Sequence, residues 1–329
     1  MLRALIAAAL ACALCAGGAS ARTEGGTPAA FVSVERSSEL VGVDLTTGAV
    51  VARIRVPAGP RDVTSYGARY VLVTSPRAGA VTLVDSFQER VLKVWRGFGR
   101  PRSVATNGAY AYVTDVGRSE LVIIDLASRK VTHRVAVRPR PHDVAVGDVA
   151  LITHASVSRR LTAAQLSWDQ SRVLRFRHFP AGGAARETSR QADSAYAYVT
   201  YSHSGIVGAL AWGTERLRWR RNVGTLLHDV AVDPYDGRSV WATDRAEGAV
   251  LALSRADGRV LRSLRGCAGA RGIASVGSAW VAAACRDANA LAFWSERDWR
   301  RKLVRVGGST SATGSQGAMG LRCHERMLP

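Results

Sequence analysis

The sequence predicts an all-β chain that closes into a seven-bladed β-propeller, with four antiparallel strands in each blade. A segment of about 40 residues recurs along the 329-residue chain, and a period of this length filled with short strands is typical of propellers. The copies carry runs rich in Val, Tyr, Trp and Thr, such as residues 110–114, and such runs predict strands. Turn residues that tolerate positive φ, such as Asn107-Gly108, follow several inner strands, and no helical period of apolar residues extends beyond the N-terminus.

Residues 1–21 predict a secretory signal peptide rather than part of the fold. A short basic start, Met1-Leu2-Arg3, precedes a continuous apolar run over residues 4–16, and Ala19-Ser20-Ala21 has the small residues of a cleavage site. The apolar run is shorter than the ~20 residues that a membrane span needs. We therefore expect an exported mature chain, residues 22–329, without a transmembrane segment. A lipid anchor at Cys12 is the alternative, although the position three before it lacks the usual Leu of a lipidation motif.

The first copy of the repeat lacks its inner strand. Its remaining strands are predicted, moving outward, at residues 31–34, 40–43 and 50–56. One inner strand is left over near the C-terminus, at residues 316–321. If this strand completes the first blade, the two ends of the chain meet there and the ring has no exposed edge between blades. We therefore expect a closed ring and a monomer.

Seven inner strands can be counted, and they begin at nearly even intervals. Their first residues, 40 to 45 positions apart, are Arg61, Arg102, His142, Arg186, His228, Arg271 and Gln316. The predicted second strands of the last six copies are residues 70–74, 110–114, 149–153, 196–200, 240–243 and 279–282. Intervals this even leave no room for a second domain, so residues 22–329 are predicted to form a single propeller.

The second strands also carry a recognisable motif. Tyr112-Val113-Thr114-Asp115 and Tyr198-Val199-Thr200 resemble the Tyr-Val-Thr-Asn repeat of secreted YVTN or YncE-like seven-bladed propellers. The resemblance extends over nearly all of residues 29–323, with Asp115 and Tyr201 in place of the Asn of the motif. It implies an exported propeller. Some members of this family are implicated in nucleic-acid binding and others sit beside redox enzymes, so the resemblance implies a fold and not one activity.

The five cysteines of the chain predict one disulfide. Cleavage of the signal removes Cys12 and Cys15, and in an oxidising compartment a pair among the remaining three is expected. Cys267 lies between the last strand of one blade and the first of the next, and Cys285 lies between the second and third strands of that next blade. Because these two kinds of loop emerge on the same face, we predict a Cys267–Cys285 disulfide and an unpaired Cys323.

The first residues of the inner strands predict a ligand site near one mouth of the central channel. The predicted ligand-binding residues, which we call the collar, are Arg61, Arg102, His142, Arg186, His228 and Arg271. Guanidinium groups bind carboxylate or phosphate as a fork, so a small anion is the expected ligand. Because histidine ordinarily titrates near pH 6.5, binding is expected to strengthen as the pH falls through about 6.5. The alternative is structural, since four inner-strand starts are followed by an acid that could pair with a base and seal the ring: Asp62, Asp143, Glu187 and Asp229.

Neither a metal site nor a catalytic group is predicted. His142, Glu187 and His228 could be drawn as two-His-one-carboxylate metal ligands. Glu187 aligns one place after the histidines, however, so alternation along the strand should turn its side chain to the other face. The stretch Ser202-His203-Ser204 lacks a Gly-x-Ser-x-Gly elbow and an acid placed to orient the histidine. No metal, cofactor or catalytic residue is therefore expected, and a hydrolase or lyase at the channel mouth is kept as an alternative function.

The charge balance points to anionic partners. The chain has 45 basic and 26 acidic residues, a formal net charge of +19, and such a surplus attracts polyanions. Alternating arginines occur in the predicted outer strands: Arg172, Arg175, Arg177, Arg216, Arg218, Arg220, Arg259, Arg262, Arg265, Arg300, Arg301 and Arg305. They predict protection of sheet edges or, alternatively, a rim that binds nucleic acid or cell-wall polymer. The function expected from the sequence is an exported, non-enzymatic propeller that binds a ligand or partner.

Overall fold

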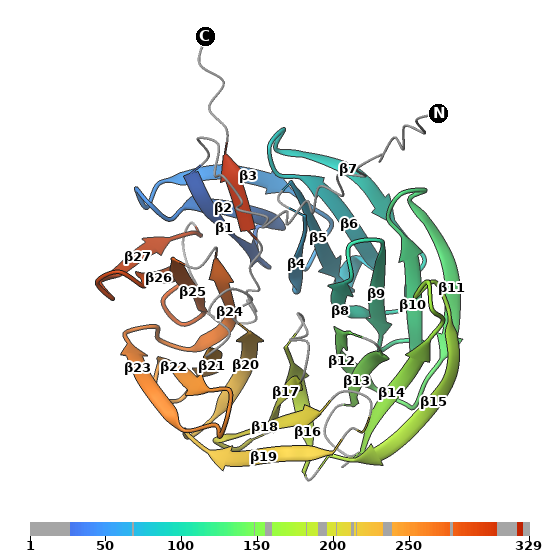
Figure 1. Ribbon diagram of the computed structural model, residues 1–329. Helices are drawn as coiled ribbons and strands as arrows, with labels where there is room; N and C mark the ends of the chain where they lie inside the picture. Colours follow the sequence, from blue (N-terminus) through green and yellow to red (C-terminus); the bar gives the residue numbers. More distant parts are fainter. Residues whose placement is uncertain are drawn as a thin grey trace, which may run out of the picture.

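The computed structural model confirms the all-β, seven-bladed architecture. It describes residues 27–67, 69–147, 149–154, 160–181, 183–189, 196–201, 203–211, 214, 216–232, 239–276, 279–307 and 321–324. Figure 1 looks along the central channel and shows seven sheets arranged as a ring, each with one strand nearest the centre. The predicted signal peptide, residues 1–21, lies outside the described residues.

Every blade is an antiparallel four-stranded sheet whose strands follow one another from the channel outward. Blade 1 contains β28 (Leu321–His324), β1 (Thr27–Val34), β2 (Glu39–Asp44) and β3 (Val50–Arg55). Blade 2 contains β4 (Val63–Tyr66), β5 (Tyr70–Ser75), the 3₁₀ turn η1 (Pro76–Ala78), β6 (Ala80–Asp85) and β7 (Arg90–Trp95). Blade 3 contains β8 (Pro101–Thr106), β9 (Tyr110–Asp115), β10 (Glu120–Asp125) and β11 (Lys130–Ala136).

The other four blades repeat this arrangement. Blade 4 contains β12 (Pro141–Val146), β13 (Val149–His154), β14 (Arg160–Leu166) and β15 (Val173–Pro180). Blade 5 contains β16 (Ala185–Thr188), β17 (Tyr196–Tyr201), β18 (Ile206–Ala211) and β19 (Leu217–Asn222). Blade 6 contains β20 (Leu227–Val232), β21 (Ser239–Asp244), β22 (Ala249–Ser254) and β23 (Val260–Arg265). Blade 7 contains β24 (Ala270–Val276), β25 (Trp280–Cys285), β26 (Ala290–Ser295) and β27 (Arg301–Arg305).

The ring closes where the two ends of the chain meet, as predicted. β28 pairs with β1 in antiparallel register, with His324 opposite Thr27 and Leu321 opposite Ala30. In Figure 1 this short red strand therefore lies in the blue first blade. The prediction placed the closing strand a few residues early: the structure has it at 321–324, and the predicted start, Gln316, lies outside the described residues.

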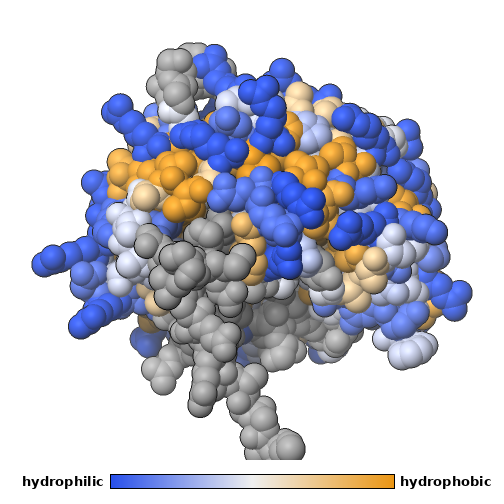
Figure 2. All heavy atoms as spheres, turned by 90° about the horizontal axis from the view of Figure 1, so that it is seen from above, coloured by the Kyte–Doolittle hydropathy of each residue, from blue (hydrophilic) through white to orange (hydrophobic). Residues whose placement is uncertain are grey.

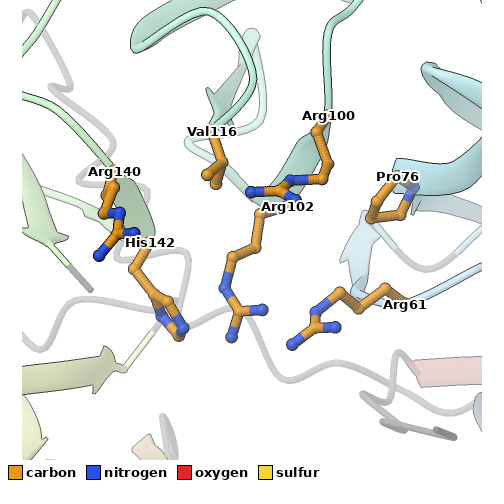
Figure 3. Close-up of a pocket in the computed structure, with 7 residues that line it drawn as sticks. All are labelled: Arg61, Pro76, Arg100, Arg102, Val116, Arg140 and His142. Carbon is orange, nitrogen blue, oxygen red and sulfur yellow. The ribbon is translucent and has the colours of Figure 1, made fainter. Parts of the chain in front are cut away.

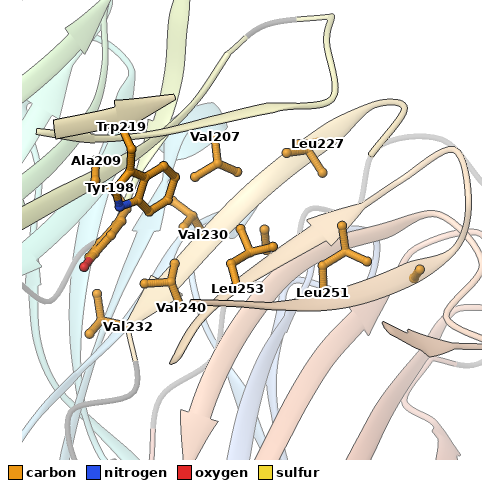
Figure 4. Packing of buried hydrophobic residues seen from close by; sticks show 12 residues of the cluster. Tyr198, Val207, Ala209, Trp219, Leu227, Val230, Val232, Val240, Leu251 and Leu253 are labelled. Atoms are coloured by element: carbon orange, nitrogen blue, oxygen red, sulfur yellow. The ribbon is translucent and has the colours of Figure 1, made fainter. Parts of the chain in front are cut away.

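The burial of each strand follows its place in the blade. Middle strands are covered on both faces by neighbouring blades, so that β6 is buried at every position. Outer strands alternate, and in β3 the buried residues Ala52 and Ile54 are each followed by an exposed arginine. Apolar side chains fill the space between blades. In Figure 4, Tyr198 and Trp219 of blade 5 pack in one cluster with Val240 of blade 6.

The repeated Thr of the second strands links each blade to the next. Thr114 accepts a hydrogen bond from the Ser103 N–H of its own inner strand (3.2 Å) and donates to the His142 carbonyl of the next blade (3.3 Å). Six such donor–acceptor pairs occur, at 2.5 to 3.3 Å: Ser33–Arg61, Thr74–Arg102, Thr114–His142, Thr153–Arg186, Thr200–His228 and Thr243–Arg271. The acceptors are the six collar residues, so the motif that predicted the fold also fixes the backbone of the collar.

The predicted disulfide is present. Cys267, which follows β23, is bonded to Cys285 at the end of β25, and both residues are buried. The bond therefore joins a loop between blades 6 and 7 to the second strand of blade 7. Cys12 and Cys15 lie outside the described residues, and only the backbone of Cys323 is described.

Removing this disulfide should lower stability by about 3 kcal/mol, because a bond between residues 18 positions apart restricts the unfolded chain. The measurement is denaturant unfolding of the protein and of the double variant Cys267→Ser/Cys285→Ser, each with and without reductant. Reductant should destabilise the parent and leave the double variant unchanged. Non-reducing peptide mapping that joins Cys323 to either partner would contradict this pairing.

Candidate functional site

The collar residues lie at the starts of six inner strands, around one end of the channel. Arg61 comes two residues before β4, and the other five are the first or second residues of β8, β12, β16, β20 and β24. Arg102, His142 and Arg186 contact one carboxylate, and in blades 6 and 7 Arg271 lies beside His228. The charge of that carboxylate, on Glu187, also acts on His228.

Glu187 is the carboxylate that Arg102, His142 and Arg186 contact. One of its oxygens lies 3.0 Å from Arg102 Nη2 and 3.5 Å from Arg186 Nε, and the other lies 3.6 Å from His142 Nδ1. The expectation that its side chain faces away from the histidines is therefore wrong. The inner strands of blades 4, 5 and 6 all shift register at this place, in blade 5 between Ala185 and Thr188, and such bulges break the strict alternation of side chains on which the expectation rested.

The acids that follow the other collar residues have a structural role. Three of them accept a hydrogen bond from a backbone N–H of the following blade, at 2.8 to 3.2 Å: Asp62 from Val104, Asp143 from Thr188 and Asp229 from Ile273. Charge-assisted bonds of this kind hold adjacent inner strands together. These acids thus join neighbouring blades through backbone N–H groups.

The two collar histidines are neutral at neutral pH. Burial lowers the pKa of His142 well below its usual 6.5, against the opposing attraction of Glu187. Burial also lowers the pKa of His228 to about 3. The expectation that both gain charge near pH 6.5 is therefore wrong. The Nδ1–H of His142 donates to the Arg186 carbonyl (3.1 Å), and Arg271 Nη1 lies 3.5 Å from His228 Nε2, where a neutral imidazole can accept.

Arg61, Arg271 and Glu187 keep their charges at neutral pH. Burial by itself raises the pKa of Glu187, but the positive charges that His142, Arg102, His228 and Arg186 carry when protonated hold that pKa well below its usual range. Burial, together with the positive charge of Arg102, lowers the pKa of Arg61 to about 9. Burial lowers the pKa of Arg271 to about 10. Both values remain far above neutral pH, so these side chains are cations.

A cavity of about 450 Å³ opens beside half of the collar. It is lined by Arg61, Pro76, Arg100, Arg102, Val116, Arg140 and His142. Figure 3 shows Arg61, Arg102 and His142 extending their ends toward the same space, with Arg100 and Arg140 projecting from the preceding loops. The cavity contains four guanidinium groups and one neutral imidazole, and its described lining includes no carboxylate. The other three collar residues, Arg186, His228 and Arg271, do not line it.

Arg100 and Arg140 were missed by the sequence analysis, although a signal was available. Each precedes a collar residue by two positions, in the phrases Arg100-Pro101-Arg102 and Arg140-Pro141-His142. Proline restricts the residue before it to extended or turn conformations, so the phrase marks a fixed approach to the inner strand. Both arginines are exposed, and Arg140 has a left-handed φ of 58°.

The other candidate sites considered from the sequence show no metal-binding or catalytic geometry among the described residues. Within the described ranges, no group of three or more His, Cys, Asp and Glu side chains could hold a metal ion. His203 is exposed, and Ser202 lies outside the described residues. Across the described part of the chain, no helix is long and apolar enough to cross a membrane.

The outer wall of the ring is mixed rather than uniformly basic. The arginines singled out in the outer strands and their turns are all exposed. Five apolar residues on the same strands are exposed as well: Leu174, Leu217, Val260, Leu261 and Leu303. Figure 2 shows an apolar band between hydrophilic residues on the side of the ring that it displays. Exposed apolar residues therefore lie among the arginines of this wall, whereas the arginines of the cavity line one common space.

Solved structures share this fold, while no protein-family model and no curated protein matches the sequence. A protein of unknown function from Desulfotomaculum acetoxidans matches with a TM-score of 0.72 and 14% identity, over 91% of this chain and 99% of its own. A proposed 6-phosphogluconolactonase from Bacteroides fragilis matches with a TM-score of 0.68 and 14% identity, over the same two shares. AztD from Citrobacter koseri matches with a TM-score of 0.67 and 11% identity, over 92% of this chain and 100% of its own. At these identities the similarity shows the seven-bladed propeller fold alone, and the resemblance to the YVTN family stays a prediction.

Proposed function

We propose that this chain is an exported, non-enzymatic propeller that binds a small anionic ligand in the cavity at the channel mouth. The observation that carries the proposal is the convergence of four guanidinium groups on about 450 Å³ of space whose described lining has no acid. Cavities of this size are typical of small-molecule sites, and guanidinium groups suit carboxylate and phosphate. Export rests on the sequence of residues 1–21 alone.

Two cations of the cavity, Arg61 and Arg102, are incompletely paired within the described part of the chain. Glu187 is shared between Arg102 and Arg186, so it compensates less than both charges. Arg102 Nε is buried and has no hydrogen-bond partner among the described residues. Arg61 makes no ion pair there either, and the charge of Arg102 lowers its pKa. A bound anion would offset this repulsion and accept the remaining donors.

The same geometry favours binding over catalysis. A general base at neutral pH needs a pKa near 7. The pKa of Glu187 is held well below its usual range, and the pKa of His142 is lowered as well, so the acid binds protons weakly and the imidazole rarely carries one. No nucleophilic side chain lines the cavity among the described residues. The hydrolase or lyase alternative therefore gains no support from these groups.

The double variant Arg100→Ala/Arg140→Ala should weaken sulfate binding about tenfold or more, because each lost guanidinium removes charge-assisted hydrogen bonds. Both side chains are exposed, so the fold should be retained. The matched control is Arg218→Ala/Arg265→Ala, which removes the same charge from exposed positions on outer strands. Isothermal titration calorimetry at constant ionic strength measures the affinities. Equal loss from both doubles would favour the polyanion alternative, and absence of binding to the parent would contradict the proposal.

Sulfate affinity should stay nearly constant between about pH 8 and about pH 6, because burial lowers the pKa of His228 to about 3 and that of His142 well below its usual 6.5. The sulfate ion keeps its charge over the same range, so a change would report the protein. The parent protein is titrated by calorimetry at several pH values and fixed ionic strength. A tenfold increase in affinity on acidification would show that a histidine gains a proton at the site and would contradict the burial argument.

A further inference from the structure

We propose that the cavity selects an anion that also carries a neutral hydroxyl group, with the guanidinium groups binding the anionic part and His142 Nε2 accepting a hydrogen bond from the hydroxyl. This inference rests on the proposed function and names the ligand class. In this arrangement the arginines of the lining donate hydrogen bonds to the anionic group, and His142 Nε2 accepts one from the neighbouring hydroxyl. The class includes hydroxycarboxylates and phosphate monoesters of polyols.

The tautomer of His142 follows from its contact in blade 5. Its Nδ1 lies 3.1 Å from the carbonyl oxygen of Arg186, and because a carbonyl only accepts, Nδ1 must carry the hydrogen. In the neutral ring Nε2 is then an acceptor. Within the described part of the chain Nε2 makes no hydrogen bond, and the ring lines the cavity beside the Arg102 side chain.

His142 Nε2 is an acceptor beside four guanidinium groups, and this restricts which ligand group can lie next to it. A carboxylate or phosphate oxygen has no hydrogen for Nε2, so a plain anion contacts the arginines and leaves His142 unused. An ammonium group could donate, but Arg61 and Arg102 would repel it. A hydroxyl next to the anionic group donates without carrying charge. Pro76 and Val116 add an apolar wall, which suits a carbon skeleton between the two polar parts.

The experiment compares pairs of ligands that differ by one hydroxyl. Malate and succinate form the carboxylate pair, and glycerol 1-phosphate and propyl phosphate form the phosphate pair, so that the two arms distinguish the source of the anionic group. In the pair that binds, the parent protein should prefer the hydroxylated member by about fivefold, the effect of one neutral hydrogen bond. Affinities are measured by calorimetry near pH 7.5, where burial keeps His142 neutral.

Two variants of His142 separate its nitrogens. His142→Asn places an amide N–H near the position of Nδ1, so it keeps the bond to Arg186 and loses the acceptor. His142→Gln places an amide oxygen near the position of Nε2 and keeps the acceptor. The hydroxyl preference should disappear in His142→Asn and persist in His142→Gln.

These measurements separate a structural role of His142, the absence of a hydroxyl preference and the absence of anion binding. A purely structural role of His142 would weaken both members of a pair equally, and melting temperatures of the variants report that loss. Preference that survives in His142→Asn overturns the proposal. So does a parent protein that binds both members of each pair equally well, which would leave the anion site of the proposed function intact. If sulfate and all four ligands fail to bind, the proposed function fails and this inference fails with it.

Discussion

Deletion of residues 314–329 should open the ring and abolish cooperative unfolding of the intact propeller. The deletion removes β28, whose four residues pair with Thr27–Ala30 of β1. The lost ladder of about four backbone hydrogen bonds corresponds to roughly 4 kcal/mol, a large share of the stability of a typical domain. The loss also exposes the edge of β1 beside Phe31 and Val32, which are buried in the closed ring. An exposed apolar strand edge pairs with other chains, so aggregation is expected.

The matched control is deletion of residues 325–329, which leaves β28 in place. Thermal unfolding by circular dichroism, together with size-exclusion chromatography, compares both truncations with the full chain. The short deletion should behave as the parent, and the long one should melt at least about 10 °C lower or elute as aggregate. A long truncation that stays monomeric with an unchanged melting curve would show that ring closure does not depend on β28.

The fold was predictable because it depends on local, repeated chemistry. Strand runs and turns recur with the same spacing, and the predicted first residues of six inner strands lie within two positions of the observed starts. The disulfide was predictable for the same reason, since strand alternation alone places Cys267 and Cys285 on one face. The closing strand was located less well. Its boundary was set by counting repeats, without a clear strand run at residues 321–324.

The site was predicted only in part, because its properties depend on tertiary structure. Bulges in the inner strands break the alternation of side chains, and Glu187 contacts Arg102 and His142, which no alternation rule anticipates. The neutrality of His228 is a consequence of burial, which sequence spacing does not show. The cavity also draws Arg100 and Arg140 from loops whose direction is fixed only when neighbouring blades pack. The sequence therefore predicts the basic residues of the inner strands, but it does not predict beside which of them the cavity forms.

Replacing Glu187 by Gln should destabilise the protein by about 3 to 5 kcal/mol and strengthen anion binding. Glu187 is 5% exposed, and it compensates Arg102 and Arg186 at 3.0 and 3.5 Å. Removal of one partner of a buried ion pair leaves the other charge uncompensated. The same loss removes a negative charge next to the cavity, so sulfate should bind about tenfold more tightly. The control is Glu39→Gln, which breaks an exposed pair with Arg53 and should cost less than about 1 kcal/mol.

The difference in stability between the parent and Glu187→Gln should depend on pH. Because the pKa of Glu187 is lower in the folded protein than its ordinary 4.5, its contribution is fully present above pH 4.5 and is lost as the pH falls through the folded value. The parent and Glu187→Gln should therefore differ most above about pH 5 and converge in acid. Urea unfolding at several pH values, with and without sulfate, measures both effects. Sulfate should restore more stability to Glu187→Gln than to the parent, since the anion takes the place of the missing charge. A variant as stable as Glu39→Gln, or one that sulfate does not rescue, would show that Glu187 does not compensate the collar cations.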